Sequence, residues 1–95
     1  MIFVQVTCGY VEDTEPFDIY QRLSNLRSMV CFVHNNEKRE LSIQFNVRRI
    51  DEARAVEYVK YMLSRVRRIH IRSIYSKRIA EPPGKIRMKR KVDIS

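Results

Sequence analysis

The sequence predicts a single small α+β domain in which two helices cover one face of an antiparallel β-sheet. Three observations support this fold class: short segments alternate apolar and polar residues, two longer segments repeat apolar residues at helical spacing, and the segments follow the order β-α-β-β-α-β. Ninety-five residues are enough for one domain and too few for two. We expect this domain to occupy residues 1–80, and residues 81–95 to form a basic C-terminal tail or arm.

The first strand is predicted from a two-residue alternation over residues 2–8. One side carries Ile2, Val4, Val6 and Cys8, and the other carries Phe3, Gln5 and Thr7. Gly9 is expected to end this strand. Pro16 follows an acidic stretch that suits the positive end of a helix, so the first helix is predicted from about Glu15 to Arg27.

A β-hairpin is predicted next, with strands at Met29–His34 and Glu40–Arg48. The residues between them, Asn35 to Lys38, have turn composition, since Asn tolerates positive φ. The second strand alternates strongly, with Leu41, Ile43, Phe45 and Val47 on one side and Ser42, Gln44, Asn46 and Arg48 on the other.

Asp51 is the predicted N-cap of a second helix that runs from Glu52 to about Arg67. The apolar stripe of this helix consists of Val56, Val59, Leu63 and Val66. Ile69 to Ile79 is predicted to be the last strand, and the Pro82-Pro83-Gly84 segment ends regular structure.

The simplest arrangement of these elements is the ferredoxin-like two-layer sandwich, with the first and third strands in the centre and one sheet face open. The alternation places on that face Phe3, Gln5, Thr7, Ser42, Gln44, Asn46, Arg48, His70 and Arg72. For the second strand the pattern leaves two alternatives, either Phe32 and His34 outward or Met29, Cys31 and Val33 outward. Amides, hydroxyls and an aromatic ring on an open sheet suit stacking and hydrogen bonding with single-stranded bases.

The charge is concentrated in the last third of the chain. Residues 1–64 hold 8 Lys and Arg against 9 Asp and Glu, and residues 65–95 hold 11 against 2. This asymmetry predicts a polyanionic partner. The basic residues predicted to contact the nucleic acid are Arg48, Arg65, Arg67, Arg68, Arg72, Lys77 and Arg78, followed in the tail by Lys85, Arg87, Lys89, Arg90 and Lys91.

Each basic group also has a structural interpretation. Arginines at the end of a helix offset its dipole, which accounts for one or two of Arg65, Arg67 and Arg68. The tail could be a phosphate-binding arm, a solubilising tail or import signal, or a charged edge strand, and we favour the arm. Tyrosines 58, 61 and 75 are expected at the margin of the core, with base stacking as the less favoured alternative.

Two family resemblances point to RNA. The Ile2-Phe3-Val4 segment resembles the start of the first signature of the RNA-recognition motif, and Arg48–Leu63 resembles the region after its second signature. The third strand departs from that motif, because Ser42, Gln44 and Asn46 stand where the family has aromatic residues. The stretch from Arg39 to Val47, followed by Ala53-Arg54-Ala55, is similar to the small dimerising subunit of the archaeal tRNA threonylcarbamoylation complex.

Other classes of function are disfavoured. The residues Cys8, Cys31, His34 and His70 lack zinc-site spacing, because Cys31 and His34 would face opposite sides of a strand, so no metal or cofactor is expected. No Gly-rich phosphate loop or nucleophile arrangement is recognisable, which argues against an enzyme. The N-terminus does not resemble a signal peptide and the longest apolar run, Met29–Val33, is too short to span a bilayer. We therefore expect an intracellular, reducing, cytoplasmic location and no membrane partner.

The favoured interpretation is a non-enzymatic RNA-binding domain of a ribonucleoprotein or RNA-processing complex. RNA is preferred to duplex DNA because no helix is built for the major groove. Phe3, Gln44 and Asn46 on the sheet would contact bases, and the basic C-terminal third would contact phosphates. The alternatives are a protein-interaction module, including a homodimer, and a sequence-tolerant DNA-binding protein.

Overall fold

The computed structural model describes residues 1–48 and 51–79 and contains six elements in that part of the chain. In chain order they are β1 (Ile2–Tyr10), α1 (Pro16–Leu23), β2 (Met29–Asn35), β3 (Glu40–Val47), α2 (Glu52–Ser64) and β4 (Ile69–Arg78). The predicted element order is confirmed. The predicted tail, with Lys85, Arg87, Lys89, Arg90 and Lys91, lies outside the described residues.

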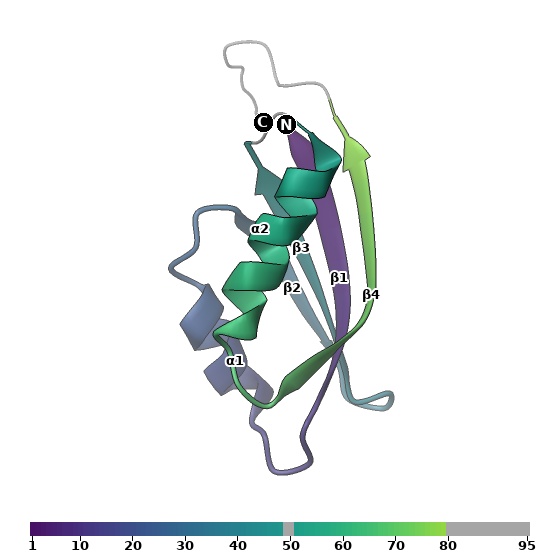
Figure 1. The fold of residues 1–95 in the computed structure, drawn as a ribbon. Helices are drawn as coiled ribbons and strands as arrows, with labels where there is room; N and C mark the ends of the chain where they lie inside the picture. The colour runs from purple at the N-terminus through teal and green to yellow at the C-terminus, as the bar shows by residue number, and fades with distance from the viewer. Residues whose placement is uncertain (49–50, 80–95) are drawn as a thin grey trace, which may run out of the picture.

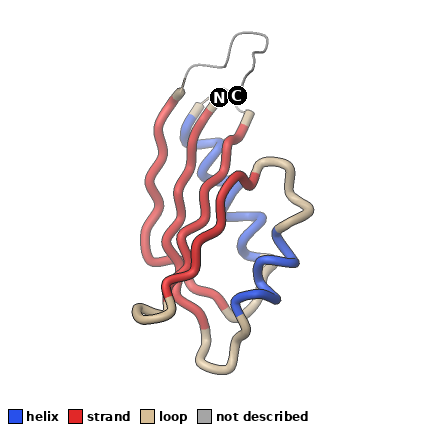
Figure 2. Tube along the Cα trace, turned by 180° about the vertical axis from the view of Figure 1, so that it is seen from behind, coloured by secondary structure: helices blue, strands red, loops and turns tan. Residues whose placement is uncertain are grey.

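The fold is a small α+β domain with a four-stranded antiparallel sheet in the order β2-β3-β1-β4. Both helices lie on the same side of the sheet (Figure 1). Seen from behind, the strands stand in front of both helices, so neither of the two described helices covers the second face of the sheet (Figure 2). α2 contacts β1 and β4, and α1 contacts β2.

The core lies between the sheet and the two helices. Its members are at most 2% exposed and come from every element except the edge strands: Ile2, Val4, Val6, Cys8, Ile19, Leu23, Leu41, Ile43, Phe45, Val47, Ala55, Val59 and Leu63. Complete burial of a large apolar side chain stabilises the fold by about 1.5–3 kcal/mol. The alternation predicted for β1 and β3 is therefore confirmed, and its apolar side faces the helices.

The register of β2 agrees with the second alternative for Cys31 and Val33, but Met29 lies opposite the buried Phe45 and therefore faces the helices. Phe32 lies opposite the buried Ile43, so it faces the helices, whereas Cys31 lies opposite Gln44 on the open face. The register shifts between Met29 and Cys31. This irregularity interrupts the two-residue period and explains why the pattern alone was ambiguous.

Both helices end earlier than predicted. α1 ends at Leu23 and not at Arg27, because the Ser24 hydroxyl donates to the Gln21 carbonyl oxygen at 2.9 Å and the chain continues in turns. Serine competes in this way with helical hydrogen bonding. α2 ends at Ser64 and not at Arg67, with the Ser64 hydroxyl on the Tyr61 carbonyl oxygen at 2.6 Å.

The start of α2 agrees with the prediction. The carboxylate of Asp51 accepts a hydrogen bond from the Arg54 backbone N–H at 2.8 Å, as an N-cap residue does. After the helix, Arg68 adopts a φ of 75°, which redirects the chain into β4. Arg67 and Arg68 are therefore in the α2–β4 connection, whereas the sequence placed them at the end of the helix.

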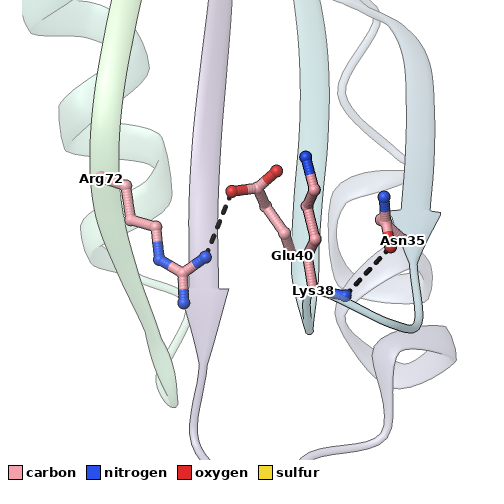
Figure 3. Close-up of polar contacts among 4 residues, drawn as sticks. All are labelled: Asn35, Lys38, Glu40 and Arg72. Atoms are coloured by element: carbon pink, nitrogen blue, oxygen red, sulfur yellow. Dashed lines mark hydrogen bonds and ion pairs between the residues drawn. The ribbon is translucent and has the colours of Figure 1, made fainter.

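Two expectations about turns are corrected. β1 continues through Gly9 to Tyr10, because Gly9 pairs with Glu40 on one side and with His70 on the other. In the β2–β3 turn the positive φ, 50°, falls on Arg39 and not on an asparagine. Asn35 contributes its side chain instead, which accepts from the Lys38 N–H at 3.0 Å (Figure 3).

The two thiols offer a direct test of the strand faces. Cys8 is fully buried and burial raises the pKa of its thiol to about 11, whereas Cys31 is half-buried on the open face. A thiol-alkylating reagent at neutral pH should therefore modify Cys31 well before Cys8, as read by peptide mass spectrometry. Preferential labelling of Cys8 in folded protein would contradict the β1 and β2 faces.

The same burial predicts a pH dependence of stability. The unfolded thiol of Cys8 loses its proton near its ordinary pKa of 9.0, whereas the folded thiol keeps it until about pH 11. This contribution to stability is complete below pH 9.0 and is lost as the pH rises to about 11. Denaturant unfolding should show that Cys8→Ala has a flatter profile in this window than the wild type, and Cys31→Ser serves as the matched control.

Candidate nucleic-acid interface

The candidate interface is the open face of the sheet. The register identifies its side chains as Phe3, Gln5 and Thr7 of β1, Cys31 and Val33 of β2, Glu40, Ser42, Gln44 and Asn46 of β3, and His70, Ser73, Tyr75 and Lys77 of β4. Of the residues predicted for base contact, Phe3, Gln44 and Asn46 all lie on this face. The apolar side chains of β1 and β3 point the opposite way, into the core, so this face is available to solvent.

An aromatic pair occupies one half of this face. The rings of Phe3 and Tyr75 have centroids 6.4 Å apart at an interplanar angle of 66°, an edge-to-face arrangement. Tyr75 is 55% exposed, although the sequence placed it at the margin of the core. Phe3 is half-buried, and together the two rings form a platform on which bases can stack.

A β-bulge explains why the sequence reasoning missed Tyr75. Alternation from His70 and Arg72 would turn Tyr75 towards the helices. The register of β4 on β1 shifts between Thr7 and Cys8, which reverses the faces beyond Arg72. Tyr75 therefore pairs with Gln5, and Lys77 with Phe3. The sequence feature that could have indicated an outward Tyr75 is a large aromatic residue close to two cations, Lys77 and Arg78, in a half-exposed strand.

A pair of amides lies in the centre of the face. Gln44 of β3 donates from Nε2 to Oε1 of Gln5 on β1 at 3.1 Å. The sheet register then places Tyr75 beside Gln5 on the outer side and Cys31 beside Gln44 on the other. One row across the sheet thus combines a thiol, two amides and an aromatic ring, with no charged residue.

Cations gather at one end of the sheet. Phe3 lies between Asn46 and Lys77, and the neighbouring Ile2 pairs with both Val47 and Arg78. Arg48 directly follows Val47, so it lies at the same end as Lys77 and Arg78. The end of β3 and the end of β4 thus lie on either side of the start of β1. Because Arg78 is opposite the buried Ile2, its position belongs to the helix side of β4.

Arg72 is held in an ion pair across the open face. Its Nη1 lies 3.2 Å from Oε2 of Glu40, so the side chain crosses β1 to reach β3 (Figure 3). Arg72 and His70 occupy the space that a side chain at Gly9 would need. A Cβ atom there would lie 2.7 Å from Nη2 of Arg72 and would overlap the His70 ring, so both side chains would have to shift. Arg72 is thus on the predicted face, but Glu40 already neutralises part of its charge.

The other three arginines of the predicted patch, Arg65, Arg67 and Arg68, are at the opposite end of the sheet. Arg68 donates from Nε to the Thr14 hydroxyl at 3.0 Å, and its carbonyl oxygen accepts from the Val11 N–H at 2.8 Å. A small hollow joins Arg67 and Arg68 to acidic residues of the α1 region, Asp13, Glu15 and Asp18. The Arg65 guanidinium lies 6.0 Å from the centre of the Tyr61 ring.

The predicted basic patch is therefore divided. β4 rises by about 3.3 Å per residue, which separates Arg68 from Arg78 by roughly 30 Å. Arg68 joins the α2–β4 connection to the segment before α1, Arg67 lines the same hollow, and Arg65 lies by Tyr61 of its own helix. The sequence could not separate these groups, because charge counting ignores which end of a strand each residue occupies.

Residues 1–48 and 51–79 contain neither a metal-binding cluster nor a helix that could span a membrane. No group of three or more His, Cys, Asp and Glu side chains in that part of the chain could hold a metal ion. Cys31 and His34 face opposite sides of β2, since they pair with Gln44 and the buried Leu41 respectively. Among the described helices, none has the length and apolarity needed to cross a bilayer.

Comparisons with protein-family models, with curated proteins and with solved structures found no match to this chain. Function is therefore inferred from the geometry of the open face. Its distinguishing features are the aromatic pair, the central amide pair and the cations at one end.

The Arg72–Glu40 ion pair predicts a measurable coupling. Its side chains are 43% and 27% exposed, so solvent screens the pair and the expected coupling is about 0.2–1 kcal/mol. A double-mutant cycle of Arg72→Gln and Glu40→Gln, read by denaturant unfolding at low and high salt, measures it. The coupling should shrink as salt rises, and an absent coupling at low salt would contradict this ion pair.

Proposed function

We propose that this chain is a non-enzymatic RNA-binding domain that holds single-stranded RNA on the open face of its sheet. The observation that carries the proposal is the pair of the half-buried Phe3 and the exposed Tyr75, which lies beside the Gln5–Gln44 amides on the face that neither described helix covers. Bases stack on aromatic rings, and amides hydrogen-bond with base edges. Membership of a ribonucleoprotein or RNA-processing complex and a cytoplasmic location are parts of the same proposal.

The proposed fold assignment is the ferredoxin-like split βαβ sandwich. The strand order β2-β3-β1-β4, with every neighbouring pair antiparallel, supports it. Its two central strands, β1 and β3, carry the outward Phe3, Gln5, Gln44 and Asn46. This arrangement gives an RNA strand the middle of the sheet as a platform.

Phosphate contacts are assigned to the end of the sheet at which Arg48, Lys77 and Arg78 lie. Lys77 is opposite Phe3, so a base stacked on Phe3 brings its phosphate towards Lys77. We assign further phosphates to the tail cations, which follow β4 in sequence. Arg72 can contact a phosphate only if its ion pair with Glu40 is broken. We propose no RNA contact for Arg65, Arg67 and Arg68.

Single-stranded RNA is favoured over duplex DNA. α2 lays Ala55, Val59 and Leu63 on the sheet, so its apolar face is occupied and it does not present a recognition helix. The aromatic pair can be used only by bases that have left a duplex. Equal affinity for duplex DNA would instead favour the sequence-tolerant DNA-binding alternative.

Aromatic substitutions test the platform. Phe3→Ala and Tyr75→Ala should each weaken binding to single-stranded RNA by roughly 5- to 150-fold, because stacking contributes about 1–3 kcal/mol per base. Fluorescence anisotropy with a labelled oligoribonucleotide measures this change. The matched controls are Phe17→Ala and Tyr61→Ala, which remove rings of 59% and 60% exposure outside the open face. An equal loss in the controls would refute the assignment of this face.

Removal of residues 82–95 tests the tail as a phosphate-binding arm. If its cations contact about five phosphates, the truncation should make the dependence of log affinity on log salt shallower by about 3.5 to 4.5. The loss should be similar for every RNA sequence, because phosphates carry no base identity. A salt titration of both proteins measures it, and an unchanged slope would exclude the arm.

A second candidate function is protein interaction through β2. This edge strand carries no Lys, Arg, Asp, Glu or Pro, the residues that usually protect an edge from pairing. Val30 and Val33 are each 52% exposed on it, and Tyr20 of α1 packs its ring edge-to-face on Phe32. A salt-insensitive dimer that is disrupted by Val30→Lys, in a protein that ignores RNA, would favour this candidate.

A further inference from the structure

The amide pair at the centre of the open face has hydrogen-bonding capacity beyond its internal bond. Each glutamine amide carries an NH2 group and a carbonyl oxygen. The 3.1 Å bond uses one N–H of Gln44 and the Oε1 atom of Gln5. The Nε2 group of Gln5 and the Oε1 atom of Gln44 take no part in that bond, so the pair retains one donor group and one acceptor. The oxygen and nitrogen atoms of a glutamine amide can be assigned in either of two orientations. If both amides are turned over, Gln5 becomes the donor and Gln44 the acceptor, and one NH2 group and one carbonyl oxygen again take no part in the bond.

The surroundings of this pair favour a planar, uncharged ligand. Its neighbours in the same row are Tyr75 and Cys31, and Phe3 lies two residues along β1. Glu40 lies four residues from Gln44 along β3, about 13 Å away, and it is engaged with Arg72. A ligand on the amides thus meets aromatic rings on one side and no charged side chain within the row.

We propose that Gln5 and Gln44 together read the Watson–Crick edge of an unpaired nucleobase stacked on Phe3 or Tyr75. This inference rests on the proposed RNA-binding function and adds the base reader to it. An unpaired base offers the two matching properties, a π-surface for the rings and an edge with adjacent donor and acceptor groups. A peptide backbone has a donor and an acceptor but no π-surface, so it uses only half of the site.

Three tasks in RNA binding fall to different side chains of the open face. Phe3 and Tyr75 hold the base by its plane, Gln5 and Gln44 recognise its edge, and Lys77 neutralises the phosphate. The bond between the two glutamines pre-orients both amides, which reduces the rotamer entropy lost when a base binds. Loss of either glutamine should therefore also loosen the remaining one.

The test compares oligouridylate with the same oligomer built from N3-methyluridine. Uracil is a suitable probe because its N3–H donor lies between two carbonyl acceptors, and the methyl group removes that donor while keeping the ring and the phosphates. Wild-type protein should bind the methylated oligomer about tenfold more weakly, within the range of a bidentate base contact. The Gln5→Met/Gln44→Met variant should bind both oligomers equally, whereas the control Gln21→Met should keep the wild-type preference.

The outcomes distinguish this inference from the function on which it rests. If the wild type binds neither oligomer, the RNA-binding proposal fails. If it binds both equally and tightly, RNA binding stands and the amide reader is overturned. Side-chain NH2 resonances of Gln5 and Gln44 supply a second readout, since they should shift with oligouridylate in the wild type. Unshifted resonances in a protein that binds oligouridylate would also overturn the reader.

Discussion

The complete burial of one side of β1 is the constraint on which the rest of the molecule depends. Ile2, Val4, Val6 and Cys8 have no exposure, because they lie on the helix side of a central strand that α2 contacts. Side chains of a strand alternate, so this burial commits Phe3, Gln5 and Thr7 to the opposite side. The candidate interface is thus a geometrical consequence of the core. A one-residue slip of β1 would turn its core residues to the open face and its open-face residues into the core.

Two irregularities then give the open face its chemistry. The bulge in the β1–β4 pairing turns Tyr75 and Lys77 outward, and the irregularity in β2 turns Cys31 outward and Phe32 inward. Gly9 adds a gap over which Arg72 reaches Glu40. Bulges re-aim side chains without breaking a sheet, which makes them suitable places for a binding site.

Electrostatics has a narrower role than the net charge of +8 suggests. The arginines of the α2–β4 connection lie beside acids of the α1 region, and Arg72 is paired with Glu40. The proposed phosphate contacts are therefore placed at one end of the sheet, where Arg48, Lys77 and Arg78 lie, and on the tail cations. The centre of the face is uncharged, so its proposed selectivity comes from rings and amides, with charge supplying affinity along the strand.

The sequence by itself determined the number, type and order of the elements, and it identified the faces of β1 and β3. These follow from local periodicity, since a strand or helix with one buried side must repeat its apolar residues at its own period. It also identified Phe3, Gln44 and Asn46 as outward residues. Only the tertiary structure decided the place of Tyr75, the face of Cys31, the ion pair of Arg72 and the division of the arginines. Each of these depends on which residue of a distant strand lies opposite, and a single extra residue in a strand reverses all the faces that follow it.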